Sequence, residues 1–337
     1  MKKYFIISIG LLVAIILAGC EGDNGASGAS NEKDLGNVDV MLDWYPNAVH
    51  SFLYVAQEKG YFEEEGIRVT IKFPANPTDP LNLAAASKVT LGLYYQPDVV
   101  MSRANEGIPV KSTGAIVRSP LNHLVFKDNS PIKTPKDLEG KKVGYPGIPI
   151  NEAIVRTIVE HDGGNIDDVE MKDVGFELGT ALIADKVDAV AGAYVNHEVP
   201  VLESKGYDVK YTNPTDYGVP SYYELVAVTS DKTWHEQQDE IEAFWRGAEK
   251  GYEYMKENPE DALQILLDHQ DEANFPLDKE VEAKSMEILI PKMESDDGFG
   301  SQEEQSWQET ADWLKEMGLI EEIPDMDDIF VNKRDIK

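Results

Sequence analysis

The stretch that decides the fold is VDVMLDWYPNAVHSFLYVAQEKGYF, residues 38–62. It opens with a short apolar run, residues 38–42, which is typical of a buried strand. The run breaks at Asp43, and apolar side chains return with helical spacing from Phe52 until Gly60, a residue that suits the end of a helix. Residues 43–50 should therefore form a loop between the carboxyl end of a strand and the amino end of a helix, where open α/β sheets bind ligands.

The same alternation continues along the chain. Up to Asp231, short apolar or alternating runs predict further strands, and segments with helical spacing separate them. After Asp231 the pattern is helical alone. Because strands alternate with helices, we expect an α/β fold with parallel or mixed sheets. The predicted strands cover residues 67–73, 89–93, 109–117, 123–127, 142–145, 169–174, 189–193, 209–211 and 223–229.

The α/β pattern begins afresh near Leu121, and the strand near residues 223–229 is expected to return to the first block. About 300 residues are available, which is enough for two domains of ordinary size. We therefore predict a two-lobed fold whose hinge consists of two crossover strands. Lobe 1 is expected to contain residues 38–120 plus 225–337, and lobe 2 residues 121–224.

The amino terminus has the pattern of a secretory signal. Lysines precede a short apolar run at residues 4–18, which is too short for a comfortable membrane span. The sequence LAGC at its end resembles the lipobox of bacterial lipoproteins, in which the cysteine is lipidated. Cys20 is the only cysteine, so an internal disulfide is excluded. We expect a signal peptide at residues 1–19 and a flexible tether at residues 20–37; an ordinary signal followed by a chance cysteine is the alternative.

Composition and motifs narrow the class of function. The formal net charge is −31, which argues against binding nucleic acid or lying flat on anionic lipid. No phosphate loop, paired-carboxylate catalyst or nucleophile with its base stands out. His50 has no second ligand at metal-binding spacing. We therefore expect a protein that is not an enzyme and has no catalytic residues, metal or cofactor.

Polar and aromatic side chains gather at three predicted strand ends, residues 43–50, 94–96 and 194–198. We expect these clusters to face one cleft between the lobes, a favoured place for ligands. The candidate ligand-binding residues are Asp43, Trp44, Asn47, His50, Tyr95, Gln96, Gly147, Tyr194, Asn196, Glu198 and Glu224.

Three segments resemble the thiamin-pyrimidine-precursor family of periplasmic-type binding proteins. They are LDWYPNAVHSFLYVAQEKGYFEEEGIRV (residues 42–69), GLYYQPDVVMSRANEGIPVKSTGAIVRSPLNHLVFK (92–127) and KTPKDLEGKKVGYPGIPINEAIV (133–155). The resemblance extends over nearly all of residues 38–318, and the cluster at residues 43–50 is its most specific part.

The resemblance implies a type II periplasmic-binding-protein-like fold. It also implies an extracytoplasmic lipoprotein that captures N-formyl-4-amino-5-aminomethyl-2-methylpyrimidine for thiamin salvage. Such a protein would be anchored through Cys20 to the outer face of the bacterial membrane and would work as a monomer. Its partners would be the permease and ATPase subunits of an ABC importer.

An aminopyrimidine suggests roles for the candidates. Trp44 is expected to stack on the ring, although it could be a core tryptophan, and Tyr194 is expected to cover the other face. The amino group and ring nitrogens of the pyrimidine could form hydrogen bonds with Asp43, Asn196 and Glu198. Alternatively, Asp43 could equally cap a helix, and Glu198 could be an ordinary acid in a first helical turn.

The remaining candidates also have two interpretations. Asn47 and His50 could donate to a formyl oxygen or cap the following helix. Gly147 could bring backbone N–H groups toward the ligand or be an ordinary turn glycine. Tyr95 and Gln96 are expected to line the floor, and Glu224 is a further acceptor beside the second hinge strand.

Three other functions fit the same residues less well. The fold could bind riboflavin or another flat heterocycle, which should need a longer cleft. It could bind a sulfonate or nitrate-type anion, but no lysine or arginine lies in the three clusters. Finally, the family includes pyrimidine synthases that use pyridoxal phosphate and iron and carry a cysteine-rich motif, whereas this chain has no cysteine after Cys20.

Overall fold

The structure is a computed structural model that describes residues 35–271, 273 and 275–331. The expected signal peptide, Cys20 and most of the expected tether lie outside the described residues. Within the described residues, no helix combines the length and the apolar character needed to cross a membrane.

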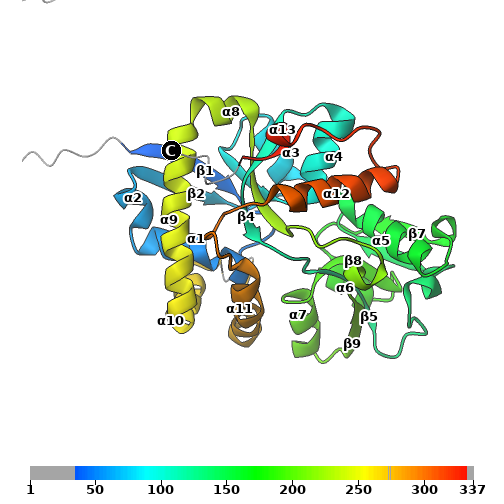
Figure 1. The fold of residues 1–337 in the computed structure, drawn as a ribbon. Helices are drawn as coiled ribbons and strands as arrows, with labels where there is room; N and C mark the ends of the chain where they lie inside the picture. The colour runs from blue at the N-terminus through cyan, green and yellow to red at the C-terminus, as the bar shows by residue number, and fades with distance from the viewer. Residues whose placement is uncertain (1–34, 272, 274, 332–337) are drawn as a thin grey trace, which may run out of the picture. The chain divides into compact units, whose positions relative to one another are not determined.

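In the part of the chain that the structure describes, ten strands form two five-stranded sheets, in the orders β2-β1-β3-β10-β4 and β7-β6-β8-β5-β9. Each sheet and its helices make one lobe, lobe 1 around the first sheet and lobe 2 around the second (Figure 1). The strands are β1 (Gly36–Met41), β2 (Ile67–Lys72), β3 (Leu91–Tyr94), β4 (Val110–Val117), β5 (Asn122–Lys127), β6 (Lys142–Tyr145), β7 (Glu170–Asp173), β8 (Ala189–Tyr194), β9 (Val209–Thr212) and β10 (Leu225–Ser230).

Helices connect the strands and make up most of the chain after β10. The α-helices are α1 (Ser51–Glu58), α2 (Tyr61–Glu64), α3 (Asp79–Ala85), α4 (Gln96–Glu106), α5 (Pro149–His161), α6 (Leu178–Ile183), α7 (Glu198–Ser204), α8 (Asp231–Glu236), α9 (Gln238–Glu257), α10 (Pro259–Asp268), α11 (Lys279–Met293), α12 (Glu304–Glu316) and α13 (Met326–Ile329). Short 3-10 helices are η1 (Ala48–His50), η2 (Pro135–Leu138), η3 (Ile166–Asp168) and η4 (Pro214–Tyr217).

Both sheets are mixed and are built in the same way. β1 pairs in parallel with β2 and β3, and β6 pairs in parallel with β7 and β8. The chain crosses from lobe 1 to lobe 2 between β4 and β5, and returns between β9 and β10. The strand that follows each crossing, β5 or β10, inserts antiparallel as the fourth strand of its sheet. The two crossings therefore end next to the parallel strands whose carboxyl ends carry the predicted polar clusters.

Two local details differ from the sequence prediction. β1 begins at Gly36 rather than Val38, because the Gly36 N–H bonds the Gly66 carbonyl and residues 36–37 pair with β2. The last two residues of the expected tether therefore belong to the sheet. The first helical turn begins at Ala48, so the polar loop after β1 is shorter than residues 43–50.

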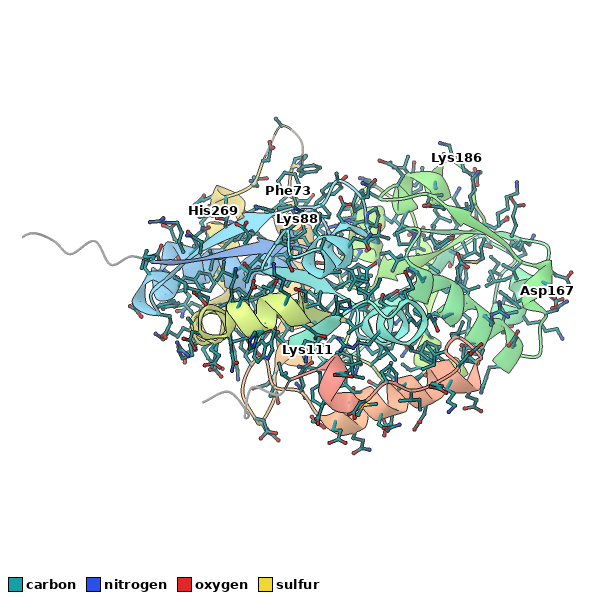
Figure 2. All side chains as sticks on the ribbon, turned by 90° about the horizontal axis from the view of Figure 1, so that it is seen from above. Phe73, Lys88, Lys111, Asp167, Lys186 and His269 are labelled. Carbon is teal, nitrogen blue, oxygen red and sulfur yellow. The ribbon has the colours of Figure 1, made fainter. Side chains whose placement is uncertain are left out.

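The core of lobe 1 depends on a close approach between α9 and the sheet. Trp245 on α9 is 1% exposed and donates from Nε1 to the Thr113 hydroxyl at 3.1 Å. Its ring lies directly over Gly114 of β4, where an added Cβ would stand 2.3 Å from Trp245 Cζ2. Gly114 is thus required by packing, since any side chain there would displace the indole. Figure 2 shows that side chains fill both lobes, with Lys111 of β4 on lobe 1 and Lys186 on lobe 2.

We predict that Gly114→Ala lowers the free energy of unfolding by about 1–3 kcal/mol, because the indole must shift to admit a methyl group. Gly179→Ala is the matched control, since its Cβ would meet only Leu202 at an ordinary 3.5 Å. This control should be neutral or slightly stabilising. Urea unfolding followed by circular dichroism measures both; equal unfolding midpoints for the two variants would contradict the packing argument.

Candidate functional site

A narrow pocket lies between the two sheets and is lined from both lobes. The space between its side chains, open solvent at the mouth included, is about 480 Å³. The lining residues are Asp43, Trp44, Asn47, Val49, Tyr95, Asn122, Pro146, Ile148, Ile150, Asn151, Gly192, Tyr194, His197, Glu198 and Glu224.

The structure brings seven of the eleven candidate residues together in this pocket. These are Asp43, Trp44, Asn47, Tyr95, Tyr194, Glu198 and Glu224. They come from the ends of β1, β3 and β8 and from the return crossing before β10. The other four candidates, His50, Gln96, Gly147 and Asn196, do not line the pocket.

His50 is fully buried beneath the loop that carries Trp44. Its Nδ1 accepts the backbone N–H of Asn47 at 3.2 Å, and its Nε2 lies 2.8 Å from Asp43 Oδ1. A neutral ring with this bonding carries its proton on Nε2 and donates it to Asp43. Both ring nitrogens are therefore occupied within the protein, and His50 holds the loop in place rather than facing a ligand.

Asn47 caps the following helix, which is one of its two predicted roles, and it also lines the pocket. Its side-chain oxygen accepts the Val49 N–H at 3.0 Å, and with His50 it forms a capping box at the start of η1. Cap bonds of this kind satisfy N–H groups that the first helical turn leaves free. Asp43 is not a cap; its carboxyl bonds His50 and borders the pocket.

The other displaced candidates are held by internal partners. Gln96 is buried and accepts the Tyr223 N–H at 2.7 Å. Asn196 donates to Ser285 Oγ on α11 at 2.9 Å. Gly147 has a φ of +75°, and a Cβ there would lie 2.8 Å from Asp173 Oδ2. It therefore serves as a turn glycine, and its neighbours Pro146 and Ile148 line the pocket instead.

Three carboxyl groups line the pocket, and none of its lining residues among those described is a lysine or arginine. Glu224 is 2% exposed, and its Oε2 accepts the N–H groups of Leu121 and Asn122 at 2.6 and 2.9 Å. Burial raises the pKa of Glu224 to about 7 despite these bonds. Desolvation also raises the pKa of Glu198, which accepts the Tyr194 N–H at 2.7 Å. The pocket is thus acidic and favours a donor-rich or cationic molecule.

A cluster of aromatic rings surrounds Trp44. Trp44 contacts Phe176 of lobe 2 edge-on, with ring centroids 4.4 Å apart. Tyr45 contacts Phe176 as well and stacks on Phe275 at 4.0 Å. Phe176 and Phe275 were not predicted from the sequence, because each lies in a polar segment without a regular pattern. These rings bring the two lobes into contact around Trp44.

Sequence reasoning also missed two buried asparagines. Asn122 donates from Nδ2 to Asn151 Oδ1 at 2.6 Å and accepts the Gly192 N–H at 2.8 Å. Both line the pocket and lie in otherwise apolar patterns, at the starts of β5 and α5. A single amide inside an apolar run was the available signal, because a buried amide needs partners.

Residues 47–262, more than half of the chain, match the protein-family model described as "NMT1/THI5 like". The chain belongs to the NMT1/THI5-like family. Most of the pocket, from Asn47 to Glu224, lies within the matched residues, and Asp43 and Trp44 precede them directly.

Relatives within this family cover the chain almost completely. A formylaminopyrimidine-binding protein of Halalkalibacterium halodurans is 50% identical over 331 residues, 98% of each chain. A Haemophilus influenzae protein named for thiamine biosynthesis is 33% identical over 84% of this chain and 88% of its own length. The fold is similar to the periplasmic aliphatic sulphonate binding protein SsuA of Escherichia coli, with a TM-score of 0.67, 14% identity and coverage of 89% and 98%. The NMT1/THI5-like chain therefore has the two-lobed fold of periplasmic binding proteins.

No group of three or more histidine, cysteine, aspartate or glutamate side chains is arranged to hold a metal ion in the part of the chain that the structure describes.

We predict that His50→Ala lowers the free energy of unfolding by about 1–3 kcal/mol, because it leaves the Asp43 carboxyl and the Asn47 N–H buried without a partner. His235→Ala on α8 removes an exposed imidazole and should stay within about 0.5 kcal/mol of the parent protein. Thermal unfolding of both variants measures the difference. A His50→Ala protein as stable as His235→Ala would remove the buried network as the support of the loop.

Proposed function

We propose that this protein is the extracytoplasmic binding component of an ABC importer and captures formylaminopyrimidine, N-formyl-4-amino-5-aminomethyl-2-methylpyrimidine, for thiamin salvage. The observation that carries this proposal is the acidic pocket between the two lobes, which combines three carboxyl groups with Trp44, Tyr95 and Tyr194. The 50% identical relative named for formylaminopyrimidine binding supports the choice of ligand.

The chemistry of the pocket suits this ligand. An aminopyrimidine is flat and offers an amino group and basic ring nitrogens, so it needs aromatic faces and acceptors close together. Trp44 and Tyr194 come from opposite lobes and supply rings, while Glu198 and Glu224 supply acceptors. Asn122 and Asn151 add an amide pair for further polar groups on the ligand.

The rival ligands are less compatible with these residues. A sulfonate or nitrate would enter a pocket with three carboxyl groups and would find no lysine or arginine among its lining residues. Riboflavin has three fused rings and a long polyol, so it should need a longer cleft than a single pyrimidine ring. A pyrimidine synthase would need pyridoxal phosphate and iron, so the absorbance of the purified protein distinguishes that alternative from a binding protein.

The remaining parts of the proposal concern location and movement. Cleavage before Cys20 and lipidation of that residue would anchor the protein, as a monomer, to the outer face of the cell membrane, where the permease and ATPase subunits are its partners. The two lobes would move relative to each other about the two crossings. Lobe 1 would contain residues 38–120 plus 225–337, and lobe 2 residues 121–224. The ligand would bind to Trp44 in the open form, and lobe 2 would then close over it.

Several contacts join the lobes without lining the pocket. Asn196 before α7 donates to Ser285 on α11, both residues being almost fully buried. Lys284 on α11 lies 2.9 Å from Glu203 on α7. On α12, Trp313 donates to Thr157 of α5 at 3.2 Å. We propose that these contacts stabilise the closed form, which gives Asn196 a role in closure instead of ligand contact. Figure 1 shows α7 and α11 on facing sides of the two lobes.

We expect Trp44→Ala to weaken the binding of formylaminopyrimidine at least tenfold, because the aromatic contact and its buried area are lost. Trp44→Phe keeps a ring and should retain most of the affinity. Isothermal titration calorimetry with formylaminopyrimidine and with riboflavin measures both. Heat with riboflavin alone would discard the ligand, and unchanged affinity in Trp44→Ala would discard the stacking role.

We expect Ser285→Ala to weaken the same binding about two- to tenfold, although Ser285 does not line the pocket, because one lost hydrogen bond shifts the balance toward the open form. Ser204→Ala on α7 is the control, since its hydroxyl bonds only the Val201 carbonyl of its own helix. Calorimetry gives the affinity and small-angle scattering gives the open fraction. Equal affinities for the two variants would remove the closure role of Asn196 and Ser285.

A further inference from the structure

We propose that the pocket binds its ligand together with one proton, which is held between the Glu224 carboxyl and a basic ring nitrogen, so that the ligand is bound as a cation. This inference rests on the proposed function, because it requires a heterocycle with a basic nitrogen. To the proposed function it adds the charge of the bound ligand and the carboxyl group that recognises this charge.

The first observation is the fixed position of Glu224. Its Oε2 accepts the N–H groups of two successive residues, Leu121 and Asn122, which belong to the other crossing of the chain. Two bonds to one oxygen prevent the carboxyl from turning away. They leave Oε1 without a backbone partner, in a group that lines the pocket and is only 2% exposed.

The second observation is that the described residues lining the pocket include no lysine or arginine that could compensate the charge of Glu224. The acidic neighbours of Glu224 are Asp43 at the end of β1 and Asp98 on α4. Asp98 Oδ1 accepts the Ile150 N–H at 3.3 Å, whereas Oδ2 is buried without a hydrogen-bond partner. Burial raises the pKa of Asp98 to about 8, so it too is disposed to hold a proton.

Uncharged phenols occupy the rest of the surroundings. The hydroxyls of Tyr95, Tyr194 and Tyr222 lie close to Glu224, and desolvation holds the pKa of each far above its ordinary value. Neither Tyr194 nor Tyr222 makes a hydrogen bond of ordinary geometry through its hydroxyl. These groups can solvate a carboxyl but cannot neutralise an ionised one.

Two histidines, His50 and His197, also lie at the site. His50 bonds Asp43. His197 lines the pocket from lobe 2; its Nδ1 lies 3.8 Å from Glu282 Oε1 and is buried without a hydrogen-bond partner. An ionised Glu224 would be a buried negative charge beside Asp43 and Asp98, with no lysine or arginine among the described residues that line the pocket.

The consequence follows from electrostatics. Desolvation, and to a lesser extent the Asp43 charge, raise the pKa of Glu224 to about 7, so in this pocket the carboxyl holds a proton far more readily than an ordinary glutamate does. A basic ring nitrogen that enters the pocket can take this proton from Oε1 and become the missing cation. The hydrogen bond that results joins two charged groups away from water and is stronger than a neutral one.

The sign of the pH dependence is fixed by this exchange. Above about pH 8 the free carboxyl has lost its proton and a weakly basic ligand is neutral, while the complex still holds one proton. Binding must then take up a proton from solution. The Kd should consequently rise about tenfold per pH unit on the alkaline side, and the rise should vanish below the pKa of the free carboxyl.

Calorimetric titration of the purified protein with formylaminopyrimidine tests the proposal directly. At about pH 8.5, in two buffers with different ionisation heats, the difference in binding enthalpy should correspond to about one proton taken up. Binding with equal heats in both buffers and a Kd independent of pH would overturn this inference and leave the proposed function intact. Absence of binding at every pH would instead contradict the proposed function.

Two variants assign the proton to a residue. Glu224→Gln keeps the shape and an oxygen that can accept the Leu121 and Asn122 N–H groups; it should bind at least tenfold more weakly and show no proton uptake. Glu242→Gln removes another buried carboxyl, which bonds Gln238 on α9 and does not line the pocket. It should match the parent protein in affinity and uptake. Proton uptake that persists in Glu224→Gln and disappears in Glu198→Gln would overturn the assignment to Glu224.

Discussion

The hydrogen bonds from Leu121 and Asn122 to Glu224 are the contact on which the arrangement of the two lobes depends. They join the two crossings of the chain, which lie more than 100 residues apart in sequence. Any relative movement of the lobes must pass through these two segments. Because the same carboxyl lines the pocket, the link between the lobes and the chemistry of the site share one side chain.

The sheet order explains why this carboxyl stands where it does. In each sheet the strand that follows a crossing inserts antiparallel beside the parallel strands, β10 next to β3 and β5 next to β8. The parallel strands end at the same edge and deliver Asp43, Tyr95 and Tyr194 there. Residues on the crossings, Asn122 and Glu224, must then lie between the polar loops of the two sheets.

The fold was predictable from the sequence because its signals are local and repeated. Strand, polar loop and helix recur in the same order, and a second block starting near Leu121 with a late returning strand leaves a two-lobed arrangement as the simplest solution. The position of the pocket was predictable for the same reason, since parallel strands end at one edge. Differences at the margins, such as the start of β1 at Gly36, come from pairing with a strand about 30 residues away.

The direction in which each polar side chain points was harder to predict. His50 and Asn196 have the same chemistry as a ligand contact, but Asp43 and Ser285 satisfy them from inside the protein. Ser285 is 89 residues from Asn196, so no local pattern could reveal it. Conversely, Asn122 and Asn151 resembled isolated polar residues in apolar elements until the fold paired them. Sequence indicates which groups can recognise a ligand, whereas long-range contacts decide which of them remain free to do so.

The free energies of the inter-lobe contacts indicate how closure of the lobes depends on ligand binding. A single hydrogen bond such as Asn196 to Ser285 contributes about 0.5–1.5 kcal/mol, a factor of about two to ten in the closed population. Three carboxyl groups line the pocket between the lobes, and any repulsion among their charges opposes closure. A ligand that supplies aromatic contact and neutralises one carboxyl removes that opposition and adds contacts to both lobes at once. In the proposed mechanism, recognition through charge and closure of the lobes are therefore two consequences of the same buried carboxyl groups.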